Sequence, residues 1–85
     1  MINAKEAAIA ASKYILDILG STPQGLRIEE VDKIVEDDKP YWLITLGYFE
    51  ATNPYGSFNL EKTYKQFKID SDSGEVLSMK MFTAK

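Results

Sequence analysis

The stretch YWLITLGYFE at residues 41–50 decides the fold, because its side chains alternate with the period of two that marks a β-strand. One face of this strand carries Trp42, Ile44, Leu46 and Tyr48. The opposite face carries Leu43, Thr45, Gly47 and Phe49. The strand therefore has no cleanly polar face, and Trp42 or its neighbours on the first face are expected to anchor the core.

Three further strands are predicted around this one, at about residues 26–36, 62–70 and 76–83. Asp37-Asp38-Lys39-Pro40 and the segment 70–75 provide the turn residues between them. The hydrophobic residues of the first strand change parity after Ile28. A bulge near Glu29-Glu30 would bring the two halves of this strand into phase.

A helix is predicted at about residues 3–19, with Asn3 as N-cap, Glu6 completing a capping box and Gly20 in the left-handed position after the last turn. Its core-facing arc consists of Ala4, Ala7, Ala8, Ala11, Tyr14, Ile15, Ile18 and Leu19. Ile9 and Leu16 fall outside that arc, either as a rim of the core or as a partner contact. The predicted fold is α+β, with one N-terminal helix packed on a four-stranded antiparallel β-meander.

The chain has 85 residues, which corresponds to a single domain over residues 1–85. It has no cysteine and no histidine, so disulfides, thiolate nucleophiles and the commonest general base and metal ligands are excluded. Asp70, Asp72 and Glu75 do not fit a calcium loop, because the EF-hand register needs glycine one position later than Gly74. We expect a turn there, and no catalytic residue, metal site or cofactor.

The formal net charge is −3, which argues against nucleic acid as a partner. Residues 1–38 carry eight acidic and four basic side chains. This excess is typical of a solvated strand edge and turn, and a surface for a basic partner is the alternative. The first twenty residues resemble neither a signal peptide nor a membrane span, so we expect a cytoplasmic protein without membrane contact.

A single helix covers only one face of a four-stranded sheet. The opposite face is predicted to carry Leu43, Phe49, Tyr64 and Phe82, and the loop at residues 51–59 adds Tyr55 and Phe58. Either the sheet curls and buries these side chains within one chain, or the open face binds a protein partner or pairs two copies as a homodimer. The loop either packs onto the end of the sheet or takes part in binding.

Most of the chain resembles a PepSY-type domain. The resemblance lies in RIEEV at residues 27–31, KPYWLI at residues 39–44, YKQFKID at residues 64–70 and, most closely, IDSDSGEVLS at residues 69–78. It implies a helix-plus-sheet module of the kind found in peptidase propeptides and regulatory proteins, and therefore a protein that modulates or inhibits a peptidase.

A similar layout occurs in cystatin-like inhibitors and in NTF2-like immunity proteins, and the strand from Trp42 to Gly47 is similar to a strand of the latter. The Gln-Val-Gly-type inhibitory loop of cystatins is absent from the sequence. The expected function is a non-catalytic protein-interaction module that acts on a peptidase. The alternative is a small intracellular immunity or anti-toxin-like protein that neutralises one cognate partner.

Overall fold

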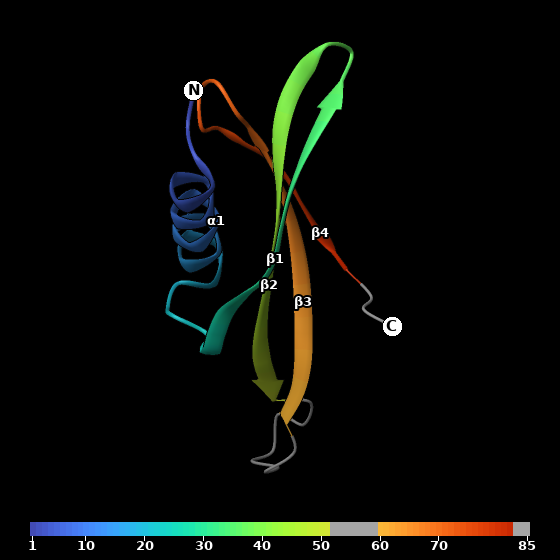
Figure 1. The fold of residues 1–85 in the computed structure, drawn as a ribbon. Helices are drawn as coiled ribbons and strands as arrows, with labels where there is room; N and C mark the ends of the chain where they lie inside the picture. The colour runs from blue at the N-terminus through green and yellow to red at the C-terminus, as the bar shows by residue number, and fades with distance from the viewer. Residues whose placement is uncertain (52–59, 83–85) are drawn as a thin grey trace.

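The computed structural model describes residues 1–51 and 60–82 and has the predicted α+β architecture (Figure 1). Its elements are α1 (Ala4–Leu19), β1 (Gln24–Glu36), β2 (Lys39–Ala51), β3 (Leu60–Asp70) and β4 (Val76–Met81). The strands form one antiparallel sheet in the order β1-β2-β3-β4. The first three strands begin two residues earlier than the sequence predicts. β4 ends at Met81, and residue 83, where it was expected to end, lies outside the described residues.

Both ends of α1 have the predicted capping residues. The Asn3 side chain accepts a hydrogen bond from the Glu6 N–H at 2.8 Å, and the Glu6 carboxylate accepts one from the Asn3 N–H at 2.9 Å. At the other end, Gly20 is left-handed with φ 80° and donates its N–H to the Leu16 carbonyl at 2.8 Å. These caps satisfy backbone groups that a helix of this length leaves unpaired at its ends.

The core lies between α1 and the two central strands. It consists of Ala7, Ala11, Ile15, Ile44, Leu46, Tyr48, Phe67 and Ile69, all at most 2% exposed. The alanines of α1 let the helix lie close to the sheet, and Tyr14 packs edge-on against Phe67 with ring centroids 6.1 Å apart. The prediction that Ile18 and Leu19 belong to this core is wrong. The buried part of the helix ends at Ile15, so both residues extend past the core and are about half exposed.

Trp42 packs at the margin of the core rather than at its centre. It is half-buried, and its indole N–H donates to the Ile2 carbonyl at 3.2 Å. The Ile2 N–H in turn donates to the Ser71 carbonyl at 2.7 Å. The prediction that this strand anchors the core is met by the neighbours of Trp42, since Ile44 and Leu46 are fully buried with the helix alanines.

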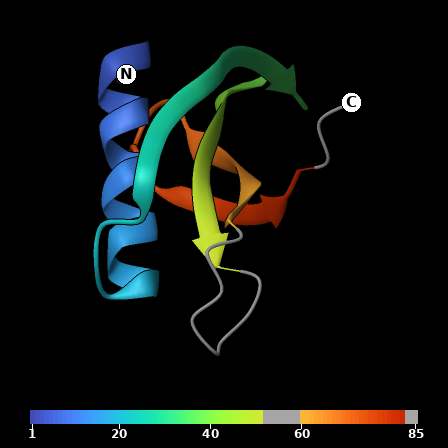
Figure 2. The same cartoon turned by 90° about the horizontal axis from the view of Figure 1, so that it is seen from below.

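A bulge in β1 shapes the sheet. The pairing register with β2 shifts between Ile28 and Glu30, so the bulge predicted near Glu29-Glu30 is confirmed. As a result, Ile28 pairs with Leu46 and Val31 with Ile44, on the face that α1 covers. The bulge also increases the local twist, and Figure 2 shows a strongly coiled sheet whose two edge strands, β1 and β4, both pass beside the helix.

The two hairpin turns differ in what holds them. Asp37 and Asp38 both have positive φ, at 51° and 63°, as a two-residue type I′ turn requires. In the turn after β3, the Asp70 carboxylate accepts hydrogen bonds from the N–H groups of Asp72 and Ser73. It also pairs with Lys39 at 2.9 Å, and this hydrogen bond holds the pKa of Asp70 below its ordinary value. The Asp70 carboxylate therefore serves the turn that the sequence predicts here.

Candidate functional site

The sheet face that α1 leaves uncovered carries the predicted interface residues of the described chain. Leu43, Tyr64 and Phe82 are half-buried there, and Phe49 is 39% exposed. Phe82 follows β4 and extends its pairing, since its N–H donates to the Tyr64 carbonyl at 3.0 Å. Tyr55 and Phe58, predicted at the end of this surface, lie outside the described residues.

Lys62 covers much of the aromatic surface on this face. Its Nζ lies 5.1 Å from the ring centroid of Phe49 and 5.8 Å from that of Tyr64. The same Nζ pairs with Glu29 Oε2 at 2.7 Å, and this hydrogen bond lowers the pKa of the Glu29 carboxyl. Cation–π contact and the apolar stem of the lysine let the two rings remain at the surface without being bare.

Gly47 leaves the space in which the Glu29–Lys62 pair lies. A Cβ added at Gly47 would be 2.6 Å from Glu29 Oε2 and 2.8 Å from Lys62 Cε. The side chain of the bulge residue therefore reaches across β2 to a lysine on β3. We call the group of Glu29, Gly47, Phe49, Lys62 and Tyr64 the lysine-covered face.

A second lysine repeats this arrangement at the other end of the sheet. Lys68 Nζ lies 4.4 Å from the ring centroid of Tyr41 and forms an ion pair with Glu36. The hydrogen bond to Glu36 raises the pKa of Lys68. Leu43 pairs with Lys68 across the two strands. Two lysines of the sheet's own strands thus lie over aromatic rings on the face opposite α1.

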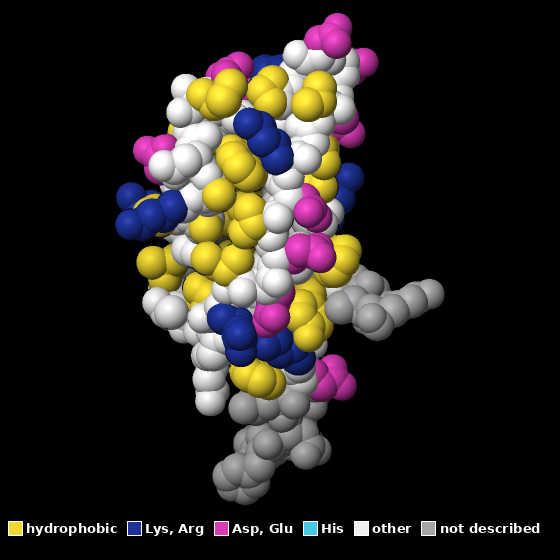
Figure 3. Space-filling model, in the orientation of Figure 1, with side chains coloured by type: hydrophobic (Ala, Val, Ile, Leu, Met, Phe, Trp, Pro, Cys, Tyr) yellow, Lys and Arg dark blue, Asp and Glu magenta, His cyan; other side chains and the backbone are white. Residues whose placement is uncertain are grey.

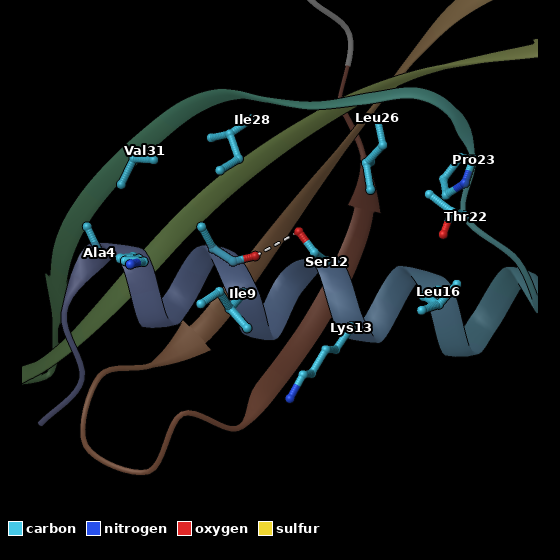
Figure 4. Close-up of a pocket in the computed structure, with 12 residues that line it drawn as sticks. Ala4, Ile9, Ser12, Lys13, Leu16, Thr22, Pro23, Leu26, Ile28 and Val31 are labelled. Carbon is cyan, nitrogen blue, oxygen red and sulfur yellow. Dashed lines mark hydrogen bonds between the residues drawn. The ribbon is translucent and has the colours of Figure 1, made fainter.

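A different surface, between α1 and β1, carries large exposed hydrophobic side chains. It is a groove of about 650 Å³ lined mainly by aliphatic residues. Figure 4 shows α1 and β1 facing each other across it, with Leu26 and Val31 directed toward the helix. Hydrophobic side chains gather over this junction on the face shown in Figure 3. We call it the α1–β1 groove; its large exposed members are Ile9, Leu16, Ile28 and Val31, which are 45%, 40%, 47% and 39% exposed.

Charged side chains lie on both elements that form the groove, cationic on α1 and acidic on the far face of β1. Lys5 and Lys13 line it on the helix side, and neither forms an ion pair within residues 1–51 and 60–82. On the other side, β1 is an edge strand, paired only with β2 among the described strands. Glu30 and Asp32 are exposed on this edge strand and make no ion pair with any described residue.

Sequence reasoning found part of this groove. Ile9 and Leu16 are predicted on the flank of the helix, one heptad apart, and both are there. The bulge that turns Val31 toward the helix was also predicted. What the sequence did not indicate is that this flank and this strand face each other, because that depends on where α1 crosses the sheet. The sequence held one further indication of the groove: β1 contains several aliphatic residues for which the sequence predicts no packing partner.

Within residues 1–51 and 60–82, no group of three or more acidic side chains lies close enough to hold a metal ion. No helix in this part of the chain has both the length and the apolar character to cross a membrane. No family model, curated protein or solved structure matches the chain.

Proposed function

We propose that this chain is a non-catalytic protein-interaction module that holds an apolar segment of a partner protein in the α1–β1 groove. The observation that supports the proposal is the set of four aliphatic side chains gathered in that groove, each about 40% exposed or more. Exposed hydrophobic side chains are ordinary when scattered singly, whereas a contiguous group on a concave surface marks a binding site.

The size of the groove limits how tightly it binds through side chains alone. Covering the exposed half of four aliphatic side chains contributes roughly 1 kcal/mol each. The total, about 4 kcal/mol, is comparable to the lower estimates of the free energy lost when two molecules associate. A partner that binds at micromolar concentration must therefore make further contacts beside the groove.

The partner class rests on the resemblance to PepSY-type domains, which supports a peptidase that the module inhibits or modulates. In this role the groove holds a segment of the peptidase and the chain contributes no reacting group. The similarity of the strand from Trp42 to Gly47 to a strand of immunity proteins supports the alternative, a toxin that the chain neutralises.

Site-specific photo-cross-linking in a native lysate tests the proposal. A photo-reactive amino acid replaces Ile9 or Ile28 in the groove, and Leu77 on β4 provides a control because it is 46% exposed outside the groove. We expect one protein to cross-link from both groove positions and not from Leu77. A third variant, with the photo-reactive group at Tyr64, tests the face opposite the helix.

The identity of the cross-linked protein separates the partner classes. A peptidase whose activity changes when the purified chain is added supports the modulator, and a toxin supports the alternative. Cross-links from Tyr64 without cross-links from Ile9 or Ile28 would place the binding site on the opposite face of the sheet. Equal labelling from all positions, Leu77 included, would contradict a specific site.

A further inference from the structure

We infer that the occupant of the α1–β1 groove is an extended segment of the partner that joins the sheet as a fifth strand on the free edge of β1. This segment carries aliphatic side chains on the face toward α1 and Lys or Arg side chains on the opposite face. The inference rests on the proposed function and deepens it by stating the conformation and chemistry of the bound segment.

The backbone of β1 supports strand addition. β1 has 13 residues and, among the strands that the structure describes, pairs with β2 alone. Its outer edge therefore presents N–H and C=O groups that another strand can pair with. A strand placed there continues the sheet past Ile28 and Val31, and every second side chain points toward the face on which α1 lies. Those side chains enter the groove that Ile9 and Leu16 border on the helix side.

The charges of β1 determine the other face of the added strand. Of the four acidic residues from Glu29 to Glu36, Glu29 is paired with Lys62 and Glu36 with Lys68. Glu30 and Asp32 are exposed without an ion pair to any described residue, and their register partners Thr45 and Leu43 lie on the face opposite α1. Opposite charges on neighbouring strands stabilise pairing and like charges oppose it. Lys and Arg are thus the residues that fit beside Glu30 and Asp32.

The same charges disfavour a second copy of the chain that pairs over the segment from Glu30 to Asp32. Two β1 strands that pair antiparallel with both helices on one face are related by a twofold axis. An axis through Glu30 or Asp32 places that residue opposite its own copy, and an axis through Val31 places Glu30 opposite Asp32. Each of these registers juxtaposes carboxylates, whereas a cationic strand meets them with opposite charge.

A pair of labelled synthetic peptides tests the charge requirement. Both are nine-residue strands with valine at alternate positions, and the residues between are all lysine in one and all glutamate in the other. Fluorescence anisotropy with the full chain measures the two dissociation constants. We expect the lysine peptide to bind at least tenfold more tightly. The double variant Glu30→Lys/Asp32→Lys should reverse this preference.

A matched variant separates a specific contact from general attraction to an acidic protein. Asp17→Lys/Glu75→Lys changes the net charge by the same amount at exposed positions away from β1. It should keep the preference for the lysine peptide. If both double variants change the preference equally, the acidic residues of β1 are not the recognition element and the inference is overturned.

Methylation of peptide nitrogens tests strand addition itself. One peptide is methylated at its odd-numbered peptide nitrogens and the other at its even-numbered ones, and we call these the two methylation frames. Alternate N–H groups of a strand point to the same side, so only one of the two frames removes the hydrogen bonds to β1. We expect one frame to weaken binding at least tenfold and the other to leave it nearly unchanged. Equal behaviour of the two frames, whether both bind or both fail, contradicts pairing with the edge.

These outcomes are distinguishable from a failure of the proposed function. If the partner cross-links from Ile9 and Ile28 but the two methylation frames behave alike, the groove binds a partner that is not an added strand. If light scattering shows a dimer that Glu30→Lys/Asp32→Lys changes, a second copy occupies the edge and the inference is wrong. If no position in the groove cross-links, the proposed function itself fails.

Discussion

The lysine-covered face and the α1–β1 groove contain similarly exposed hydrophobic residues in different surroundings. Phe49 and Val31 are both 39% exposed. Over Phe49 lies the ammonium group of Lys62, held by Glu29, whereas the lysines that line the groove with Val31, Lys5 and Lys13, form no ion pair with any described residue. The exposed fraction of a hydrophobic side chain alone therefore does not show whether that surface is available to a partner. The difference lies in whether a charged side chain of the same sheet is fixed over the apolar group.

The largest effect that tests this comparison is expected from Gly25→Ala. Gly25 has φ +68°, and an added Cβ would lie 2.7 Å from the Phe49 ring. Backbone strain combined with displacement of this ring should lower the free energy of unfolding by about 2–3 kcal/mol. Urea denaturation measures the loss.

Gly20→Ala is the matched control, because Gly20 has φ +80° but no atom within 4 Å of an added Cβ. Only the backbone strain remains, at about 1 kcal/mol. Equal losses for the two variants would show that Phe49 does not pack firmly against Gly25, and the lysine-covered face would then be no better packed than the groove.

Removing the lysine that covers the aromatic residues should make the two surfaces alike. We expect Lys62→Ala to lower stability by about 1 kcal/mol, through lost stem packing and cation–π contact. It should also increase the fluorescence of a dye that binds hydrophobic surfaces. Lys80→Ala, at an exposed position of β4, should change neither quantity. Unchanged dye binding in Lys62→Ala would mean that the lysine does not cover Phe49 and Tyr64 in solution.

Acid should weaken the lysine-covered face. Because its hydrogen bond to Lys62 lowers the pKa of Glu29, the folded state favours the carboxylate more than the unfolded chain does. The stabilisation is complete above the ordinary value of 4.5 and is lost as the pH falls through the lowered pKa. Glu29→Gln should therefore reduce the dependence of stability on pH below 4.5, measured by urea midpoints. The same acid dependence in the variant and the parent would contradict a stabilising Glu29–Lys62 pair.

The smallest effect is expected in the groove. Val31→Thr keeps the shape of a β-branched side chain at an exposed site, so the free energy of unfolding should change by no more than about 0.5 kcal/mol. Ile44→Thr makes the corresponding kind of change at the fully buried partner of Val31 and should cost several times more. A large loss from Val31→Thr would mean that the groove is part of the core rather than an open surface.

The features predicted correctly are those set by residues close together in the chain. Asn3 and Glu6 cap the helix, Gly20 ends it, and the bulge follows from the change of parity after Ile28. Each depends on a spacing of a few residues, which the sequence displays directly. The alternating pattern of residues 41–50 likewise placed Ile44 and Leu46 in the core.

The features missed depend on how distant segments meet. The lysine-covered face needs Glu29, Gly47 and Lys62, one from each of three strands, in a register that no local pattern specifies. The exposure of Ile18 and Leu19 and the existence of the groove both depend on where α1 crosses the sheet. Alternation assigns a residue to a face, but it does not show which residues of neighbouring elements cover that face.

The hydrogen bond from the Ile2 N–H to the Ser71 carbonyl affects the order in which the chain folds. During synthesis α1 leaves the ribosome first, yet the Ile2 N–H finds its acceptor only after the turn following β3 has formed. The hairpin of β1 and β2 has its partners close in sequence and closes early, on the microsecond scale typical of hairpins. A nascent chain stopped before residue 71 already holds the strand residues that α1 packs on, but the hydrogen bond that fixes Ile2 to the turn after β3 forms only once that turn is present.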